Sequence, residues 1–343
     1  MSVKTIAYQF SQTRGEAGLL HTRAIDFCML MKPRVMVLAV FTAFVGLVIA
    51  PVDLHPLNAF VAVLAIAAGA GAAAVLNMWY DADIDAVMAR TAKRPIPRGK
   101  VLPIEALVFG IVLAMAAIAV LALATNVAAG TLLALAILFY VIVYTAWLKR
   151  LTPQNIVIGG AAGALPPVIG WAAATGQIGI EPLVLFLIIF LWTPPHFWAL
   201  ALNRTDEYAG AGVPMLPVVA GRAATTRQIL IYCALLSAAS VLPWALGFAG
   251  PIYAAAAIGC GAKLVVLAIQ LRISDEADRR APRRLFAFSI FYLFVLFAAV
   301  LIDHADQPQR STPVFSSRTV HAEALPNAAR AAGISITTGT DEV

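Results

Sequence analysis

The chain has 343 residues, of which 61% are apolar and 12% are charged, and 24 Lys and Arg against 18 Asp and Glu give a net charge of +6. Soluble domains contain roughly 45–50% apolar and about 25% charged residues, so this composition, with its mean hydropathy of +0.86, excludes a water-soluble globular protein. It also excludes disorder over most of the length, because disordered chains are poor in apolar residues.

Nine stretches are long and apolar enough to cross about 30 Å of hydrocarbon as helices. In chain order we place them at 35–50, 57–77, 102–124, 128–146, 155–174, 182–202, 228–248, 252–271 and 284–302. They are uninterrupted and do not alternate with the period of barrel strands. The sequence therefore predicts an all-α polytopic membrane protein, whose short first span is expected to extend back through Cys28 to Met31.

Three parts of the chain follow from this pattern. Residues 1–30 are predicted to be an N-terminal segment, and residues 31–302 are predicted to be the membrane domain. From Asp303 onward Pro, Ser, Thr and Ala with scattered charges replace the apolar runs, so 303–343 are predicted to be a flexible tail.

Lysine and arginine gather in alternate connections. The short connections at 51–56, 125–127, 175–181 and 249–251 contain none, whereas the second, fourth, sixth and eighth connections are basic. Because Lys and Arg in short loops mark the cytoplasmic side, the basic connections and the N-terminus are predicted to face the cytoplasm. Nine spans then place the C-terminus on the other side, and we expect any active site at the cytoplasmic end.

The end of the second span carries an acidic motif. Asn77, Asp81 and Asp85 are spaced four apart, which places them on one helix face. Two carboxylates at this spacing repel, so a cation must lie near them. One interpretation is a set of ion pairs at the membrane border with the basic residues that follow. The other is Mg²⁺, which is commonly held by one or two carboxylates together with substrate phosphates, and acidic groups at this depth favour a functional site.

Basic residues follow the acidic motif and are predicted to bind a diphosphate. They are Arg90, Lys93, Arg94 and Arg98, and Pro95 and Pro97 limit the flexibility of this run. Arginine offers paired donors to phosphate oxygens. Lys149 and Arg150, at the end of the fourth span, are assigned to the same site, with the alternative that they only extend their charges to the membrane surface.

The sixth span and the connection after it contain two further candidate features. Asn203 and Glu207 are again four apart, which indicates a duplicated half with a site at the interface of the repeats. His196 follows Pro194 and Pro195 inside an apolar run, and the break that these prolines are expected to make is tolerated where the helix lines a cavity or packs on protein. His196 is interpreted either as a hydrogen-bonded interior residue or as a ligand.

At these residues the chain resembles a known family. Asn77xxxAsp81xxxAsp85 followed by Arg90 and Arg94-Pro-Ile-Pro is similar to the first signature of the UbiA superfamily of intramembrane prenyltransferases, and the likeness covers about residues 30 to 302. Four further segments resemble the branch that transfers a farnesyl group to haem. They are Lys32-Pro-Arg34, the run from Tyr144 to Asn155, Trp192-Thr-Pro-Pro-His196-Phe-Trp, and Ala211-Gly-Val-Pro-Met-Leu-Pro217.

The resemblance implies nine helices around a central cavity in a bacterial inner membrane, with farnesyl diphosphate and haem B as substrates and Mg²⁺ as cofactor. It implies that Asp81 and Asp85 hold the metal with Asn77 in support, and that His196 faces the haem iron or the cavity wall while Lys32 and Arg34 pair with haem propionates. Many members have a second DxxxD signature, where this chain has Asn203 and Glu207, so a second metal site stays open. Docking of a haem A synthase or an oxidase-assembly partner also stays open.

Three alternatives remain at this point. A prenyltransferase acting on an aromatic quinone precursor is weakened by Asn203, Glu207 and the His196 segment. A membrane transporter also predicts broken helices and intramembrane polar groups, but it does not predict acidic residues beside a basic loop on one side only. A haem-binding assembly factor would not require the diphosphate-type loop.

Overall fold

The computed structural model describes residues 23–306, so residues 1–22 of the predicted N-terminal segment and residues 307–343 of the predicted tail lie outside the described part. The longer helices are α2 (Pro33–Val48), α3 (Pro56–Tyr80), α5 (Pro103–Ala124), α6 (Val127–Leu138), α10 (Ile180–Leu202), α12 (Leu216–Ala239), α14 (Pro251–Ile273) and α15 (Arg280–Asp306). The shorter ones are α4 (Ala82–Val87), η1 (Phe139–Leu148), α7 (Lys149–Leu151), α8 (Asn155–Ala164), α9 (Pro166–Thr175), α11 (Thr205–Gly210) and α13 (Leu242–Ala245).

These helices confirm the predicted all-α membrane architecture. Eight helical stretches between residues 23 and 306 are long and apolar enough to span a membrane, and a bent pair supplies a ninth if it is counted as one span. That pair is the helix Arg23–Leu30 and α2, which meet at 52°. The predicted first span is therefore two helices with a sharp bend, which begin well before Met31.

Local sequence explains where the helices begin. Proline occupies the first turn of α2, α3, α5, α12 and α14, where its missing N–H costs no hydrogen bond. Asn126 caps α6, because its side chain accepts a hydrogen bond from the Ala129 N–H at 3.0 Å. The short connections that were predicted from the sequence are thus built from proline starts and polar caps.

Two predicted boundaries were wrong for physical reasons. The seventh span was placed at 228–248, but α12 begins at Leu216 and contains a kink at Gly221, whose backbone is non-helical (φ 74°, ψ 176°), before the part that was predicted. The ninth span was ended at 302, but α15 continues to Asp306. Asp303 is buried and accepts hydrogen bonds from the N–H groups of Gly250 and Tyr253, both at 2.8 Å, so this charge caps α14 instead of ending a span.

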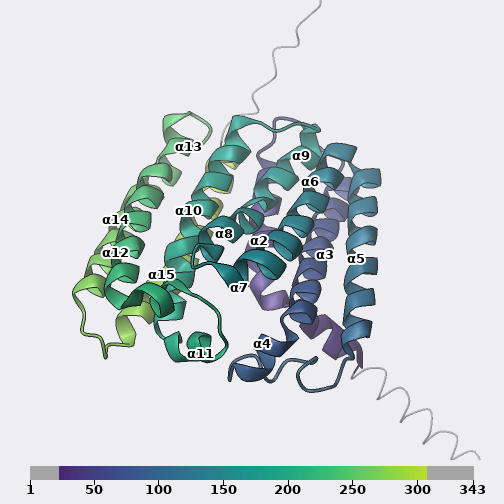
Figure 1. Ribbon diagram of the computed structural model, residues 1–343. Coiled ribbons are helices and arrows are strands. Elements are labelled where there is room, and N and C mark those ends of the chain that lie inside the picture. Colours follow the sequence, from purple (N-terminus) through teal and green to yellow (C-terminus); the bar gives the residue numbers. More distant parts are fainter. Residues whose placement is uncertain (1–22, 307–343) are drawn as a thin grey trace, which may run out of the picture. The chain divides into compact units, whose positions relative to one another are not determined.

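The helices pack around two hydrophobic cores, with α2 and α9 contributing to both. One core joins them to α10, α12, α14 and α15, and the other joins them to α3, α5 and α6 (Figure 1). At this central contact an added Cβ on Gly46 would collide with the carbonyl of Pro167, and one on Gly170 would collide with the carbonyl of Ala43. The backbones of α2 and α9 therefore touch, which only glycine allows.

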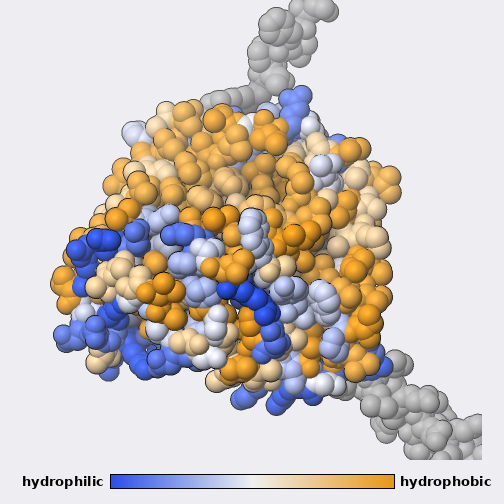
Figure 2. Space-filling view, in the orientation of Figure 1, coloured by the Kyte–Doolittle hydropathy of each residue, from blue (hydrophilic) through white to orange (hydrophobic). Residues whose placement is uncertain are grey.

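The polar connections lie together at one end of the bundle. Figure 2 shows apolar residues over most of the visible flank and hydrophilic residues gathered at the end that carries α4 and α11. Ile84 and Met88, from the second connection, share a small apolar cluster with Tyr208, Val213 and Met215 of the sixth. The two loops that the sequence identified as repeats are thus in contact.

Candidate active site

The acidic motif forms a buried row at the junction of α3 and α4. Asn77, Asp81 and Asp85 are 5%, 0% and 3% exposed. The backbone ladder runs through the junction, because the Asp81 N–H donates to Asn77 O at 3.0 Å and the Asp85 N–H donates to Asp81 O at 2.8 Å. The Asn77 amide also donates to Asp81 Oδ2 at 2.7 Å. The predicted stacking on one face is therefore present.

Each carboxylate of the row has a cationic partner. Lys149 Nζ donates to Asp81 Oδ2, and Arg94 Nη1 donates to Asp85 Oδ2 at 2.5 Å. Arg150 Nη2 lies 3.8 Å from Asp81 Oδ1. Of the basic residues named for the ion-pair interpretation, Arg94 is the one that reaches the row.

The other basic residues of the second connection lie at the surface. Arg90, Lys93 and Arg98 are exposed, and within the described part of the chain none of them makes an ion pair. Arg90 is nevertheless within electrostatic range of the Tyr144 hydroxyl. The predicted diphosphate set therefore divides into Arg94, Lys149 and Arg150 at the acidic row and a solvated group around it.

Arg150 links the row to the surface. It donates to both carboxylate oxygens of Asp83 at 2.8 Å and approaches the ring of Tyr80 at 5.1 Å. These hydrogen bonds lower the pKa of the exposed Asp83 carboxyl to about 2. Asp83 thus stays ionised at neutral pH and orients Arg150 beside Asp81.

Lys32 enters the site through the bend in the first span. Its backbone is left-handed, with φ 53° and ψ 54°, and among residues 23–306 it is the one non-glycine residue with a positive φ. The following Pro33 disfavours the right-handed helical region at Lys32, and such strain is typical of functional sites. Lys32 Nζ donates to Asn77 Oδ1 at 2.7 Å, whereas Arg34 is exposed on α2.

A π-helix places a residue that sequence reasoning missed. In η1 the Thr145 hydroxyl donates to Tyr140 O at 2.8 Å and accepts from the Asn77 amide at 3.1 Å. π-helical turns are rare and are frequent at functional sites. The run from Tyr144 to Asn155, noted for its family resemblance, contains this position, but no role of its own was predicted for it from the sequence. The turn fixes Asn77 and leads directly into Lys149.

The donors around the acidic row fit a divalent cation. Asp81 Oδ1 is buried without a hydrogen-bond partner. Within the described residues no group of three or more His, Cys, Asp and Glu side chains could hold a metal ion alone. Mg²⁺ needs no such cage, because it takes one or two carboxylates, waters and substrate phosphates. The residues present therefore suit Mg²⁺ that arrives with a phosphorylated substrate.

The second pair of polar residues at four-residue spacing, Asn203 and Glu207, is arranged differently from the acidic row. The Asn203 amide donates to the carbonyl of Arg279 at 3.3 Å, whereas Glu207 Oε1 accepts from Arg204 at 3.0 Å. No hydrogen bond joins Asn203 to Glu207 among the described residues, so their spacing alone does not make a joint site. Glu207 Oε2 is buried and unpartnered. Its neighbour Tyr208 belongs to the same apolar cluster as Ile84, which follows Asp81 by three positions.

His196 lies in an aromatic stack. It is 8% exposed, and its ring centroid is 4.2 Å from that of Trp192 and 4.5 Å from that of Phe286. Its Nδ1 is 2.7 Å from Ser289 Oγ, and that hydroxyl donates to Phe286 O at 2.7 Å. The Ser289 proton is thereby used, so we assign the His196 proton to Nδ1 and the lone pair to Nε2. The hydrogen-bonded interpretation is thus observed, and Nε2 keeps the chemistry of a ligand.

The predicted break beside His196 was wrong. α10 is continuous from Ile180 to Leu202 with Pro194 and Pro195 inside it. Each proline removes one helical hydrogen bond. The Thr193 hydroxyl donates to Ile189 O at 2.9 Å, and Trp192 Nε1 donates to Ser289 O at 2.7 Å, which ties this turn internally and to α15. The helix therefore keeps its course because its neighbours hold it.

Sequence comparisons identify relatives of this chain. The model of the UbiA prenyltransferase family matches residues 39–299. The chain is 56% identical over 292 residues to Protoheme IX farnesyltransferase 2 of Mesorhizobium japonicum, covering 84% of this chain and 93% of that one. It is 58% identical over 283 residues to Protoheme IX farnesyltransferase of Afipia carboxidovorans, covering 82% and 90%.

Solved structures share the fold at low identity. A digeranylgeranylglyceryl phosphate synthase superposes with a TM-score of 0.69 at 18% identity, covering 83% of this chain and 100% of that one. A UbiA homologue from Archaeoglobus fulgidus bound to GPP and Mg²⁺ superposes with a TM-score of 0.58 at 17% identity, covering 80% and 99%. These likenesses establish a common arrangement of helices.

Proposed function

Because the chain belongs to the UbiA prenyltransferase family, we propose that it transfers the farnesyl group of farnesyl diphosphate to a vinyl group of haem B and so forms haem O for terminal oxidases. The observation that carries this proposal is the likeness, over more than four-fifths of the chain, to proteins named protoheme IX farnesyltransferase. The buried acidic row with its cations supplies the chemistry that such a transfer needs.

The proposed metal-diphosphate site is the acidic row. Asp81 and Asp85 would hold Mg²⁺ with Asn77 in support, and the bound ion would offset the charge of the diphosphate and ease its departure. Thr145 and Lys32 orient Asn77 through their hydrogen bonds.

The cations that pair with the row are proposed to exchange partners when substrate binds. Lys149, Arg94 and Arg150 lie within reach of the carboxylates, so an arriving diphosphate meets donors that are already positioned. Lys32, which the resemblance assigned to a haem propionate, is proposed to serve the diphosphate instead.

The attraction of these cations to the diphosphate grows as the allylic C–O bond breaks, which lowers the activation barrier. The exposed Arg90, Lys93 and Arg98 add a positive approach surface.

The proposed transfer breaks the C–O bond of farnesyl diphosphate and forms a C–C bond to haem. The electrons of the C–O bond leave with the diphosphate, and the farnesyl C1 forms a bond to the terminal vinyl carbon of haem B. The cation left on the porphyrin side of the new bond takes up water and loses a proton, which gives the hydroxyethylfarnesyl group. The apolar helices around the site exclude water until the farnesyl cation has reacted.

The haem is proposed to lie toward α10 and α15. The Nε2 lone pair of His196 offers an uncharged nitrogen to the haem iron, and the stacked rings of Trp192 and Phe286 offer flat apolar surface. Arg34 is proposed to meet a haem propionate. The basic end is proposed to face the cytoplasm of a bacterial inner membrane. A haem A synthase or an oxidase-assembly partner stays a prediction.

A direct assay tests the proposal. Membranes that contain the protein, haem B, radiolabelled farnesyl diphosphate and Mg²⁺ should yield a more hydrophobic labelled haem. Asp81→Ala and Asp85→Ala should each lower the yield by at least a hundredfold, since each removes a carboxylate from the row. Wild-type yields from both variants would refute the metal-site assignment. Transfer to 4-hydroxybenzoate but not to haem would assign the chain to the quinone branch.

A further inference from the structure

A single lysine lies in the middle of a membrane span on its outer face. Lys263 follows the start of α14 at Pro251 by twelve residues and precedes its end at Ile273 by ten. At 1.5 Å per residue it is about 15 Å or more from either end. Its side chain is exposed on a helix at the edge of the bundle (Figure 1). Charged residues within spans normally face the protein interior or a water-filled cavity, so this position calls for a partner.

Within the described part of the chain no carboxylate pairs with Lys263. Its ammonium lies over the ring of Phe288 on α15, 4.7 Å from the centroid. That contact places the charge beside α15. A cation–π contact leaves the remaining donors of the ammonium group unused. The site therefore presents a positive charge to the hydrocarbon.

The same face of α14 is shaped for a close helix contact. Ala255 and Gly259 precede Lys263 by eight and four positions and are exposed. No atom lies within 4 Å of the place where a Cβ on Gly259 would stand. Small residues at this spacing let a neighbouring helix approach the backbone closely in a membrane. The charge thus stands beside a flat strip.

We propose that this face of α14, defined by Ala255, Gly259 and Lys263, binds a transmembrane helix of another protein that carries a carboxylic acid side chain at mid-depth. Charge complementarity selects this occupant, because an acid buried opposite Lys263 satisfies both groups in a medium without water. A second copy of this chain is disfavoured. A symmetric pair would bring two Lys263 side chains together, and none of the described spans has an exposed Asp or Glu near its middle.

Designed helices test the proposal with the full-length protein. The protein, labelled at its C-terminus with a fluorescent donor, is reconstituted into phosphatidylcholine vesicles with an acceptor-labelled Leu/Ala transmembrane peptide that has one central Glu. A peptide with central Gln is the matched control. The wild-type protein should bind the Glu peptide at least fivefold more tightly than the Gln peptide, and Lys263→Met should abolish the difference. Lys263→Glu should instead prefer a peptide with central Lys.

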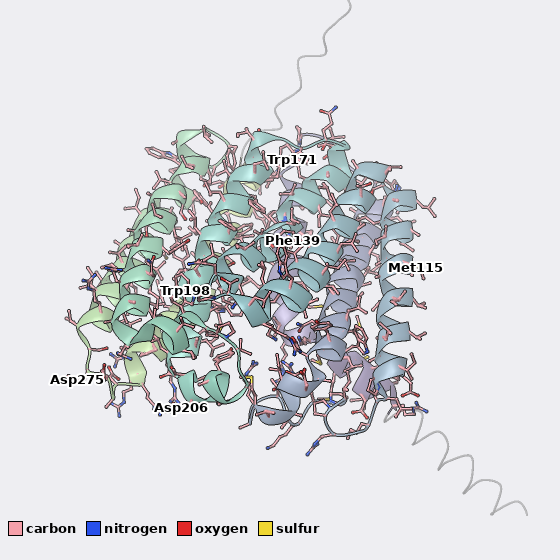
Figure 3. All side chains as sticks on the ribbon, in the orientation of Figure 1. Met115, Phe139, Trp171, Trp198, Asp206 and Asp275 are labelled. Atoms are coloured by element: carbon pink, nitrogen blue, oxygen red, sulfur yellow. The ribbon has the colours of Figure 1, made fainter. Side chains whose placement is uncertain are left out.

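A control substitution on the opposite flank tests whether any lipid-facing substitution changes the preference for the Glu peptide. Met115, labelled in Figure 3, is 59% exposed on α5, and Met115→Leu should leave the preference for the Glu peptide unchanged. Prenyl transfer by Lys263→Met should stay at the wild-type level, which shows that the variant is folded. No preference in the wild-type protein, or an equal preference in Lys263→Met, would overturn the proposal.

Discussion

Asp81 is the most enclosed carboxylate of the row, and its two oxygens have different surroundings. Oδ2 accepts from Lys149 and Asn77, whereas Oδ1 is buried without a hydrogen-bond partner, with Arg150 Nη2 3.8 Å away. A buried carboxylate with one unused oxygen is costly in a protein at rest. It is useful when a cation and its phosphate arrive, because the oxygen needs no released partner before it can bind.

Removal of Lys149 should show how much its positive charge stabilises the buried Asp81 carboxylate. Among the described residues, Lys149→Met leaves Arg150, at 3.8 Å, as the one cation in ion-pair distance of the buried Asp81, so we expect a loss of roughly 3–5 kcal/mol in the free energy of unfolding. Asp81→Asn in the same chain should restore most of that loss, because the uncompensated charge is gone. Prenyl transfer should stay low in both. Thermal melting in detergent, read beside haem product yield, measures the two effects. A double variant that melts as low as Lys149→Met would contradict the argument.

Residue types and spacing identified the row itself, but not how its members are held. The four-residue spacing of Asn77, Asp81 and Asp85 predicts the stacked face from local geometry alone. Thr145 escaped prediction because its role depends on a π-helical turn, and hydropathy does not distinguish such a turn from an α-helix. Asn203 was placed by its spacing from Glu207, whereas its amide actually meets a carbonyl 76 positions further along the chain.

At the scale of elements, the contact between α2 and α9 fixes the position of Lys32. α2 begins directly after Lys32 and lies between the two cores. Its backbone rests on α9 at Gly46 and Gly170. Because helices in a membrane associate through packing and not through exclusion of water, this close approach sets where the bend presents the lysine.

Gly170→Ala should therefore destabilise the protein. The added methyl group would meet the carbonyl of Ala43 and force the two helices apart, which we expect to cost about 1–3 kcal/mol of unfolding free energy. Gly163→Ala on α8 is the matched control, since no atom lies within 4 Å of its added Cβ. The control should be neutral or slightly stabilising. Equal melting temperatures for the two variants would show that the α2–α9 contact is looser than described.

Hydropathy predicted the helices well and their interruptions poorly. A window of apolar residues reports transfer into hydrocarbon, so it finds α3, α5 and α14 without knowledge of backbone angles. The bend at Lys32 and the irregular turn at Gly221 depend on single positive φ values, 53° and 74°. The two prolines of α10 predicted a break that is absent. The Thr193 hydroxyl bonds within the helix and the Trp192 indole bonds to α15, and these contacts hold α10 together.

At the scale of the described bundle, the Lys and Arg residues of the connections are sorted to one end. The second and sixth connections both contribute to one apolar cluster there, with Ile84 and Met88 from the first and Tyr208 from the second, so the acidic row and Glu207 lie at the same end of the bundle. The sequence could suggest this meeting from the repeated spacing, but the apolar contacts that join the loops are long-range in sequence. The connections at the far end contain no Lys or Arg.

This sorting predicts the orientation of the chain in the membrane. Because Lys and Arg resist transfer across the membrane, the basic end should be cytoplasmic. In a parent chain with its three native cysteines replaced by serine, Asp53→Cys and Glu276→Cys place exposed thiols in the connections before α3 and after α14. A membrane-impermeant maleimide applied to spheroplasts should label Asp53→Cys at once and Glu276→Cys only after permeabilisation. The reverse pattern would place the acidic row on the outer side, where neither prenyl diphosphates nor newly made haem are supplied, and would remove the proposed substrates with the orientation.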